Sequence, residues 1–136
     1  MFGRNDKKKT DPPAGDAEQV HASQHVVAER RGRVINATLQ PETVSEHESR
    51  ILLEELGTLC LEQASSRLAI GLDHVTVLTS AGIGMLVQLH KKLSADGGGI
   101  AVYGLNDDLS HLMKLTRMDK LFTIKPDADE AVAALV

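Results

Sequence analysis

Helix-like and strand-like patterns alternate along most of this chain, and this alternation limits the fold more than any other feature. Nearly continuous apolar runs at residues 67–72 and 100–103 are typical of buried strands. Between them, apolar residues recur at helical spacing from residue 83 to about residue 95. Strands that alternate with helices are joined by right-handed crossovers, which place the strands side by side in parallel. The sequence therefore predicts an α/β fold with a mixed, mostly parallel sheet packed against helices.

Turn and cap signals define the remaining elements. Short strands are expected at residues 26–28 and 34–39, joined by a tight turn through Gly32. Thr43 and Glu46 have the spacing of a capping box, with the hydroxyl first and the carboxylate three positions later. Further signals are a glycine run at 97–99 that ends a helix, a helix cap at 106–108, an edge strand at 121–124 and a helix start at 126–127. The expected order is β-β-α-β-α-β-α-β-α.

The N-terminal stretch, residues 1–22, differs in composition from the rest. It contains three consecutive lysines at 7–9, two prolines at 12–13 and hardly any large apolar side chain after Phe2. Such a stretch buries too little apolar surface to offset the entropy lost on ordering it. We therefore expect a disordered tail over residues 1–22 and one folded domain over residues 23–136.

Composition and charge exclude several classes of protein. The formal net charge is −4 and only three residues are aromatic, so a surface that binds nucleic acid directly is not expected. The single cysteine, Cys60, lies among leucines, which excludes an internal disulfide and predicts an inert core thiol. No apolar run is long enough to span a bilayer, and the first residues lack the apolar stretch of a secretory signal. We expect a cytoplasmic protein with no membrane span.

Catalytic and metal-binding patterns are not found in the sequence. The six histidines show neither HxH nor HExxH spacing, so no metal and no cofactor is expected. A serine before a helix invites comparison with the nucleophile elbow of hydrolases. That motif needs a glycine two residues before the serine, and this chain has Leu78 there. We therefore expect no catalytic residue and no enzyme activity.

Two adjacent hydroxyls mark the most informative junction in the chain. The β-branched run at residues 75–78 stops at Thr79 and Ser80, and a helical pattern begins across the small residues of 81–84. A helix N-terminus favours a hydroxyl cap, and its positive end also favours a phosphate. Glycine costs roughly 1 kcal/mol inside a helix, a cost that is useful where another surface must approach the backbone closely. A simple cap and a modifiable hydroxyl beside a docking face are the two interpretations that remain open.

Three segments, at residues 75–86, 89–105 and 115–122, are together similar to one known family. The first contains a hydrophobic strand, a hydroxyl residue, a serine, a small pair and an apolar helix, in that order. With the other two segments it resembles the STAS domain of anti-sigma factor antagonists, also called anti-anti-sigma factors. The resemblance covers roughly residues 26–135, which is nearly all of the chain outside the tail. It implies the STAS-like form of the α/β fold predicted above.

The resemblance also implies a regulatory binding module that is switched by phosphorylation. Such a domain docks on an anti-sigma factor, often a serine kinase, which phosphorylates the serine at the start of the second helix; a serine phosphatase resets it. By motif position the acceptor is Ser80, with Thr79 as the alternative. The implied docking residues are Thr79, Ser80, Ala81, Gly82, Ile83 and Gly84. The family context is a bacterial phosphoprotein in transcription regulation. The alternative is a constitutive scaffold subunit of a stressosome-like or lipid-transport assembly.

This chain departs from the family pattern at three positions. Thr79 stands where an acid usually precedes the acceptor, and Ala81 stands where a second serine often follows. The acid usually found near the end of the third strand falls at Gly71, with Asp73 two residues later. The surroundings of Ser80 therefore carry less negative charge than the family pattern implies.

Overall fold

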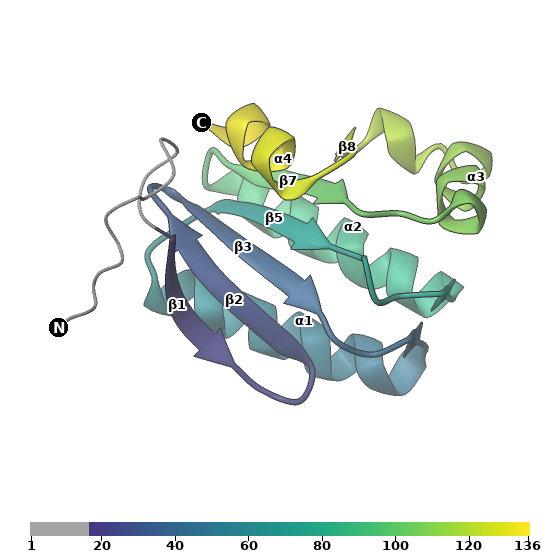
Figure 1. Ribbon diagram of the computed structural model, residues 1–136, viewed down its shortest axis with the longest axis horizontal. Coiled ribbons are helices and arrows are strands. Elements are labelled where there is room, and N and C mark those ends of the chain that lie inside the picture. The colour runs from purple at the N-terminus through teal and green to yellow at the C-terminus, as the bar shows by residue number, and fades with distance from the viewer. Residues whose placement is uncertain (1–16) are drawn as a thin grey trace, which may run out of the picture.

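A central six-stranded sheet organises the computed structural model, which describes residues 17–136. Its strands are β1 (Ala17–Ala22), β2 (Val26–Arg31), β3 (Val34–Leu39), β5 (Arg67–Gly71), β7 (Gly99–Tyr103) and β8 (Thr123–Lys125). They lie side by side in the order β1-β2-β3-β5-β7-β8 (Figure 1). The pairs β1–β2 and β2–β3 are antiparallel, and the pairs β3–β5, β5–β7 and β7–β8 are parallel. The predicted mixed, mostly parallel sheet is confirmed.

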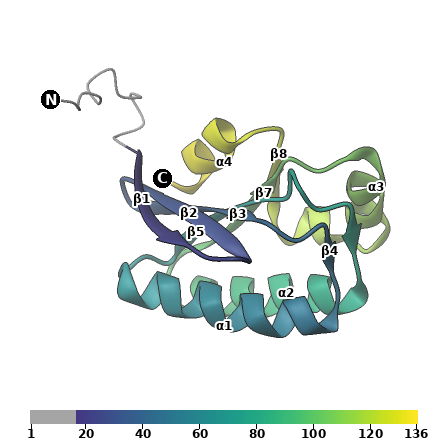
Figure 2. The ribbon, with the colours of Figure 1, turned by 60° about the horizontal axis from the view of Figure 1, so that its bottom comes forward.

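Helices cover the two faces of this sheet unequally. They are α1 (Glu46–Glu62), α2 (Ser80–Ala95), α3 (Asp107–Leu115) and α4 (Ala128–Leu135), with a short 3-10 helix, η1 (Met118–Lys120). The helices α1 and α2 run side by side along one face, and α4 lies on the other (Figure 2). Within residues 17–136, no helix is long and apolar enough to cross a membrane.

The core follows the apolar pattern of the sequence. Leu52, Leu56 and Leu59 recur at helical spacing on α1 and are buried against the sheet. On β5, Ile70 belongs to this larger core, whereas its neighbour Ala69 belongs to the smaller core under α4. Successive strand residues point to opposite faces, so both faces of β5 are covered. Burying a large aliphatic side chain stabilises the fold by roughly 1.5–3 kcal/mol, and these helices are held mainly in this way.

Six residues that composition assigns to the tail form strand β1. The prediction of disorder over residues 1–22 does not hold for Ala17–Ala22, which pairs with β2. Val20 packs against the core, and His21 and Ser23 both hydrogen-bond the carboxylate of Glu55 on α1. These are tertiary contacts, which an argument from local composition does not include. Residues 1–16 lie outside the described residues.

A second, two-stranded sheet fixes the entry to α2. Strand β4 (Thr43–Val44) pairs in parallel with β6 (Val77–Leu78).

Because Thr43 belongs to β4, the predicted capping box is wrong by two residues. The N-cap of α1 is Ser45, whose backbone N–H and hydroxyl donate hydrogen bonds to Oε1 of Glu48 at 3.0 and 2.5 Å. These hydrogen bonds lower the pKa of Glu48 to about 2.

The later elements agree with the predicted order, with one shifted boundary. The helix α2 ends at Ala95, and the glycine run at 97–99 forms the turn into β7. The last edge strand begins at Thr123, two residues later than predicted, because η1 and the turn after it occupy the preceding residues. The strands β1, β4 and β6 are additions to the expected order, and the fold class is unchanged.

Candidate functional site

The two hydroxyls at the start of α2 have different surroundings. Thr79 is the N-cap of α2 and is half-buried. Its backbone N–H and its Oγ1 both donate hydrogen bonds to the carbonyl oxygen of Val44, at 3.1 and 3.0 Å. Ser80, the first residue of the helix, is exposed. The β4–β6 pairing thus directs the Thr79 hydroxyl into the fold and leaves Ser80 as the accessible hydroxyl.

Among residues 17–136, no side chain caps the N-terminus of α2. Asn106 and Asp127 cap α3 and α4, each accepting a hydrogen bond from a first-turn amide, at 2.7 and 2.9 Å. The Thr79 side chain makes no such bond, and the first turn of α2 carries no acidic residue. The first intrahelical bond is donated by the N–H of Ile83 to the oxygen of Thr79. Because the earlier N–H groups have no intrahelical partner, the positive end of α2 is not neutralised by the helix itself.

The two glycines of α2 serve different purposes. A methyl group at Gly82 would lie 2.5 Å from Cδ1 of Leu78 and 3.1 Å from the carbonyl oxygen of Val44, so the Leu78 side chain or the Val44 backbone would have to shift to admit it. At Gly84, no atom lies within 4 Å of the methyl position. Glycine costs roughly 1 kcal/mol relative to alanine inside a helix. At Gly84, nothing in the described fold requires that cost.

This difference predicts opposite effects of the same substitution. We expect Gly84→Ala to raise the free energy of unfolding by about 0.5–1 kcal/mol, because alanine favours the helix and its methyl group meets no atom. We expect Gly82→Ala to lower it by about 1–3 kcal/mol, because Leu78 or the backbone of Val44 must move. Urea denaturation of both variants measures the two changes. Effects of the same sign would contradict the assigned surroundings.

A cavity of about 260 Å³ lies between α1 and α2 near Ser80. Ala81 and Gly84 line it from α2, and Ser49 and Leu53 line it from α1. The Ser49 hydroxyl is buried and has no hydrogen-bond partner within the described part of the chain. The small side chains of α2 therefore open onto a hollow whose other wall comes from α1.

The six predicted docking residues do not form one exposed patch. Gly82 is buried and Thr79 is bonded to Val44, whereas Ser80 is exposed and Ala81 and Gly84 are half-buried beside the cavity. Ile83 is half-buried against the core. Two features of this site were not predicted from the sequence: the wall that α1 gives to the cavity, and the hydrogen bond from Thr79 to Val44. The β-branched pair at residues 43–44 is compatible with the short strand β4, but two residues are too few to indicate a strand by themselves.

An aromatic ring occupies the space beside Gly71, where the family pattern has an acid. A methyl group at Gly71 would lie 2.6 Å from the phenol oxygen of Tyr103. The phenol crosses β5 and donates a hydrogen bond to Oδ1 of Asn36 on β3. Burial raises the pKa of Tyr103, and the carboxylates of Asp73 and Glu29 add to this effect. The end of β5 therefore carries a neutral phenol in place of an acid.

The thiol of Cys60 is part of the core, as predicted. The residue is 4% exposed, and burial raises the pKa of its thiol to about 11. A rise from 9.0 to about 11 lowers the thiolate fraction at neutral pH about a hundredfold. We therefore expect iodoacetamide to alkylate the folded protein at least about a hundredfold more slowly than the urea-unfolded chain. Intact mass spectrometry follows both rates, and similar rates would contradict the burial of this thiol.

Clusters of potential metal ligands were considered for residues 17–136 because a metal ion could also mark a functional site. No group of three or more His, Cys, Asp or Glu side chains is placed there so that it could hold a metal ion. The start of α2 combines an accessible hydroxyl, uncapped amides and an adjoining cavity. This arrangement suits the binding or attachment of an anion.

Comparison with known proteins identifies the family. A family model of the STAS domain matches residues 24–131. A candidate anti-sigma factor antagonist from Thermotoga maritima has a TM-score of 0.71 at 19% identity, over 79% of this chain and 92% of that one. An anti-sigma factor antagonist from Mycobacterium paratuberculosis has a TM-score of 0.70 at 21% identity, over 92% and 97%. The Bacillus cell fate determinant SpoIIAA, in its phosphorylated form, has a TM-score of 0.62 at 14% identity, over 80% and 97%.

At these identities the solved structures show a shared fold, and the family model adds a match in sequence over most of the chain. The fold, the helix that begins at Ser80 and the predicted STAS resemblance all agree with this match. This protein belongs to the STAS domain family.

Proposed function

We propose that this protein is a non-enzymatic regulatory module that docks on an anti-sigma factor with serine kinase activity and is switched by phosphorylation of Ser80. The observation that carries the proposal is the exposed Ser80 hydroxyl at an uncapped helix N-terminus. The names of the structural neighbours support it, because they include anti-sigma factor antagonists and one phosphorylated form. A serine phosphatase resets the switch, and the module works in the bacterial cytoplasm.

The geometry favours Ser80 over Thr79 as the acceptor. Phosphorylation of Thr79 would remove the hydroxyl proton that bonds to Val44 and would place a charged group at a half-buried position. At Ser80, the transfer joins Oγ to the γ-phosphorus of ATP, releases ADP and frees the hydroxyl proton. The product carries about −1.5 to −2 charges at neutral pH, and the free amides of the first turn of α2 can solvate it. The fold can therefore accept the modification without rearranging.

Docking on the partner is expected to centre on Ser80, Ala81 and Gly84 and to include the cavity beside them. Gly84 leaves the helix backbone open there, so a partner side chain can approach closely. A phosphate on Ser80 would bring charge and bulk to the middle of this contact. Phosphorylation thus separates the complex while leaving the domain folded.

The modification itself tests the proposal. Wild-type protein serves as bait to purify the partner kinase, and the purified kinase then receives fresh protein and ATP. We expect intact mass spectrometry to show one added phosphate on the wild type and none on Ser80→Ala. Ser94→Ala is the matched control, because Ser94 is an exposed serine at the other end of the same helix. A phosphate retained by Ser80→Ala, or absent from the wild type, would defeat the proposal.

A constitutive scaffold subunit is the second candidate function. The observation that favours it is Thr79, which stands directly before Ser80 where the family pattern has an acid. In such an assembly the same surface of α2 packs permanently, and no kinase acts on Ser80. Partner binding by a charged variant of Ser80 distinguishes the two candidates.

A further inference from the structure

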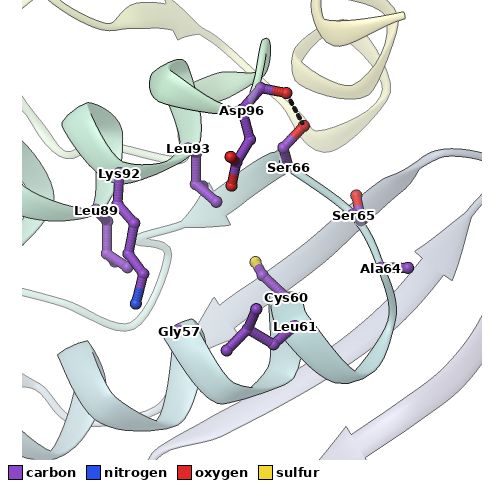
Figure 3. Close-up of a pocket in the computed structure, with 10 residues that line it drawn as sticks. All are labelled: Gly57, Cys60, Leu61, Ala64, Ser65, Ser66, Leu89, Lys92, Leu93 and Asp96. Carbon is purple, nitrogen blue, oxygen red and sulfur yellow. Dashed lines mark hydrogen bonds between the residues drawn. The ribbon is translucent and has the colours of Figure 1, made fainter.

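A second cavity, of about 280 Å³, lies between the C-terminal halves of α1 and α2 (Figure 3). It is separate from the Ser80 region, which adjoins the N-terminal half of α2. Cys60 and Leu93 form its apolar middle, while Lys92 lies toward one end and Asp96 and Ser66 lie toward the other. Ligand sites are mostly apolar with a few converging polar groups, and their volumes begin at roughly 300 Å³. This cavity suits a small molecule with polar groups at both ends.

The two charged side chains of this cavity do not pair with each other. Lys92 and Asp96 are four residues apart on one helix, a spacing at which opposite charges commonly form an ion pair. Figure 3 shows instead that the Lys92 side chain reaches toward Gly57 on α1, while the Asp96 carboxylate lies nearer Ser66. Neither charge forms a salt bridge with another residue of the range 17–136. The cavity therefore presents a cation and an anion at separate places along an apolar wall.

Gly57 keeps the lysine end of the cavity open. It is a buried glycine in the middle of α1, where glycine costs roughly 1 kcal/mol relative to alanine. A methyl group at this position would lie 3.6 Å from Nζ of Lys92, an ordinary contact distance, so the fold does not exclude alanine. The missing methyl group leaves room beside the ammonium group of Lys92. Helix stability alone does not account for this glycine, and the space that it leaves beside Lys92 is available to a bound molecule.

We propose that this cavity binds a small zwitterion, an aliphatic molecule with an acid group at one end and an amine at the other. The acid group pairs with Nζ of Lys92, and the amine pairs with the carboxylate of Asp96. The aliphatic middle packs against Cys60 and Leu93. Both charges of the ligand then meet an opposite charge, which neither a simple fatty acid nor a simple amine achieves. A metabolite bound at this site could act on the domain from a place separate from Ser80.

Calorimetry with a set of straight-chain probes tests the proposal on the full chain. The zwitterions range from β-alanine to ε-aminocaproate, and hexanoate and hexylamine each carry only one charged end. We expect at least one zwitterion to bind and to shift the amide resonances of Gly57, Cys60 and Leu93. We expect hexanoate and hexylamine to bind about tenfold more weakly, since each lacks one charge pair.

Substitutions at the two ends identify the contacts. We expect Lys92→Met to weaken binding of the zwitterion about tenfold and to leave the affinity for hexylamine unchanged. We expect Asp96→Asn to weaken binding of the zwitterion by a similar factor and to leave the affinity for hexanoate unchanged. Lys91→Met is the matched control, because Lys91 is the neighbouring exposed lysine and does not line the cavity. Ser80→Ala must also leave binding unchanged, which keeps this test separate from the phosphorylation test.

Three results would overturn the proposal. One is the absence of binding by every zwitterion at millimolar concentration. Another is equal affinity for the zwitterion and for both single-ended probes, which would indicate apolar partition rather than charge recognition. The third is an equal loss of affinity in Lys91→Met and Lys92→Met, which would indicate a general effect of net charge.

Discussion

Replacing Gly71 by aspartate, an acid such as the family pattern has here, is expected to lower the free energy of unfolding by about 3 kcal/mol or more. A Cβ atom at this position would lie 2.6 Å from the phenol oxygen of Tyr103 and 2.9 Å from its Cε2. The ring must therefore move, and its hydrogen bond to Asn36 is lost. The new carboxylate would also sit in a buried position near those of Asp73 and Glu29, which already act on the phenol. Urea denaturation measures the loss.

A second substitution separates the steric cause from a general intolerance of charge. Tyr103→Ala removes the ring and is itself expected to cost about 3–5 kcal/mol, because Tyr103 is 4% exposed. If the ring is the obstacle, the double variant is less destabilised than the sum of the two single variants by about 1–3 kcal/mol. Additive losses would show that Tyr103 and the side chain at 71 do not compete for the same space.

This coupling explains one departure from the family pattern in physical terms. Tyr103 lies on β7 and reaches Asn36 on β3, so the strand between them, β5, must carry no side chain at the crossing point. Glycine at 71 and tyrosine at 103 are therefore one structural feature. Loss of the family acid at Gly71 follows from core packing and does not by itself argue against a switch at Ser80.

Local signals account for the parts of the fold that the sequence predicted well. The helical stripe of α1 and the caps at Asn106 and Asp127 each depend on residues within one or two turns of each other. The cap side chains accept hydrogen bonds from amides three residues later, so spacing alone reveals them. The alternation of such segments with apolar runs was sufficient to predict the α/β class.

Long-range contacts account for what was missed. Val44 lies 35 positions before Thr79, and the β4–β6 pairing that joins them has only two residues in each strand. No periodicity is visible in two residues, so a capping box was the better local interpretation of residues 43–46. Strand β1 was also missed because long-range contacts hold it, namely those with Glu55 on α1 and the pairing with β2.

The position of Ser80 at the start of a helix was predicted from the sequence, whereas its surroundings are known only from the structure. The motif places a serine at the start of a helix, and the structure has Ser80 there as the first residue of α2. The small residues at 81–84 were together interpreted as part of a docking face. Only the packing separates Gly82, which the fold needs, from Gly84, which it does not. Both positions are glycine, so residue type alone does not distinguish them.

The charged substitution Ser80→Asp is expected to weaken binding to the anti-sigma factor about 30- to 150-fold, equivalent to a loss of about 2–3 kcal/mol. The negative charge would lie at the centre of the docking surface that we propose, which is formed by Ser80, Ala81 and Gly84. The same substitution is expected to stabilise the free domain by about 0.3–1 kcal/mol, because an acid at the first position of α2 complements the uncapped helix end. Calorimetric titration measures binding, and urea denaturation measures stability.

Ser80→Asn is the matched control, since asparagine has nearly the shape of aspartate without its charge. If charge is what separates the partners, Ser80→Asn keeps most of the affinity and Ser80→Asp does not. Gly84→Ala tests the proposed docking surface in a second way, because the added methyl group enters that surface while alanine stabilises the helix. Equal affinity of Ser80→Asp and the wild type would exclude the switch and favour the scaffold. A surface that packs permanently has no reason to keep an exposed hydroxyl at an uncapped helix end, and a regulated surface does.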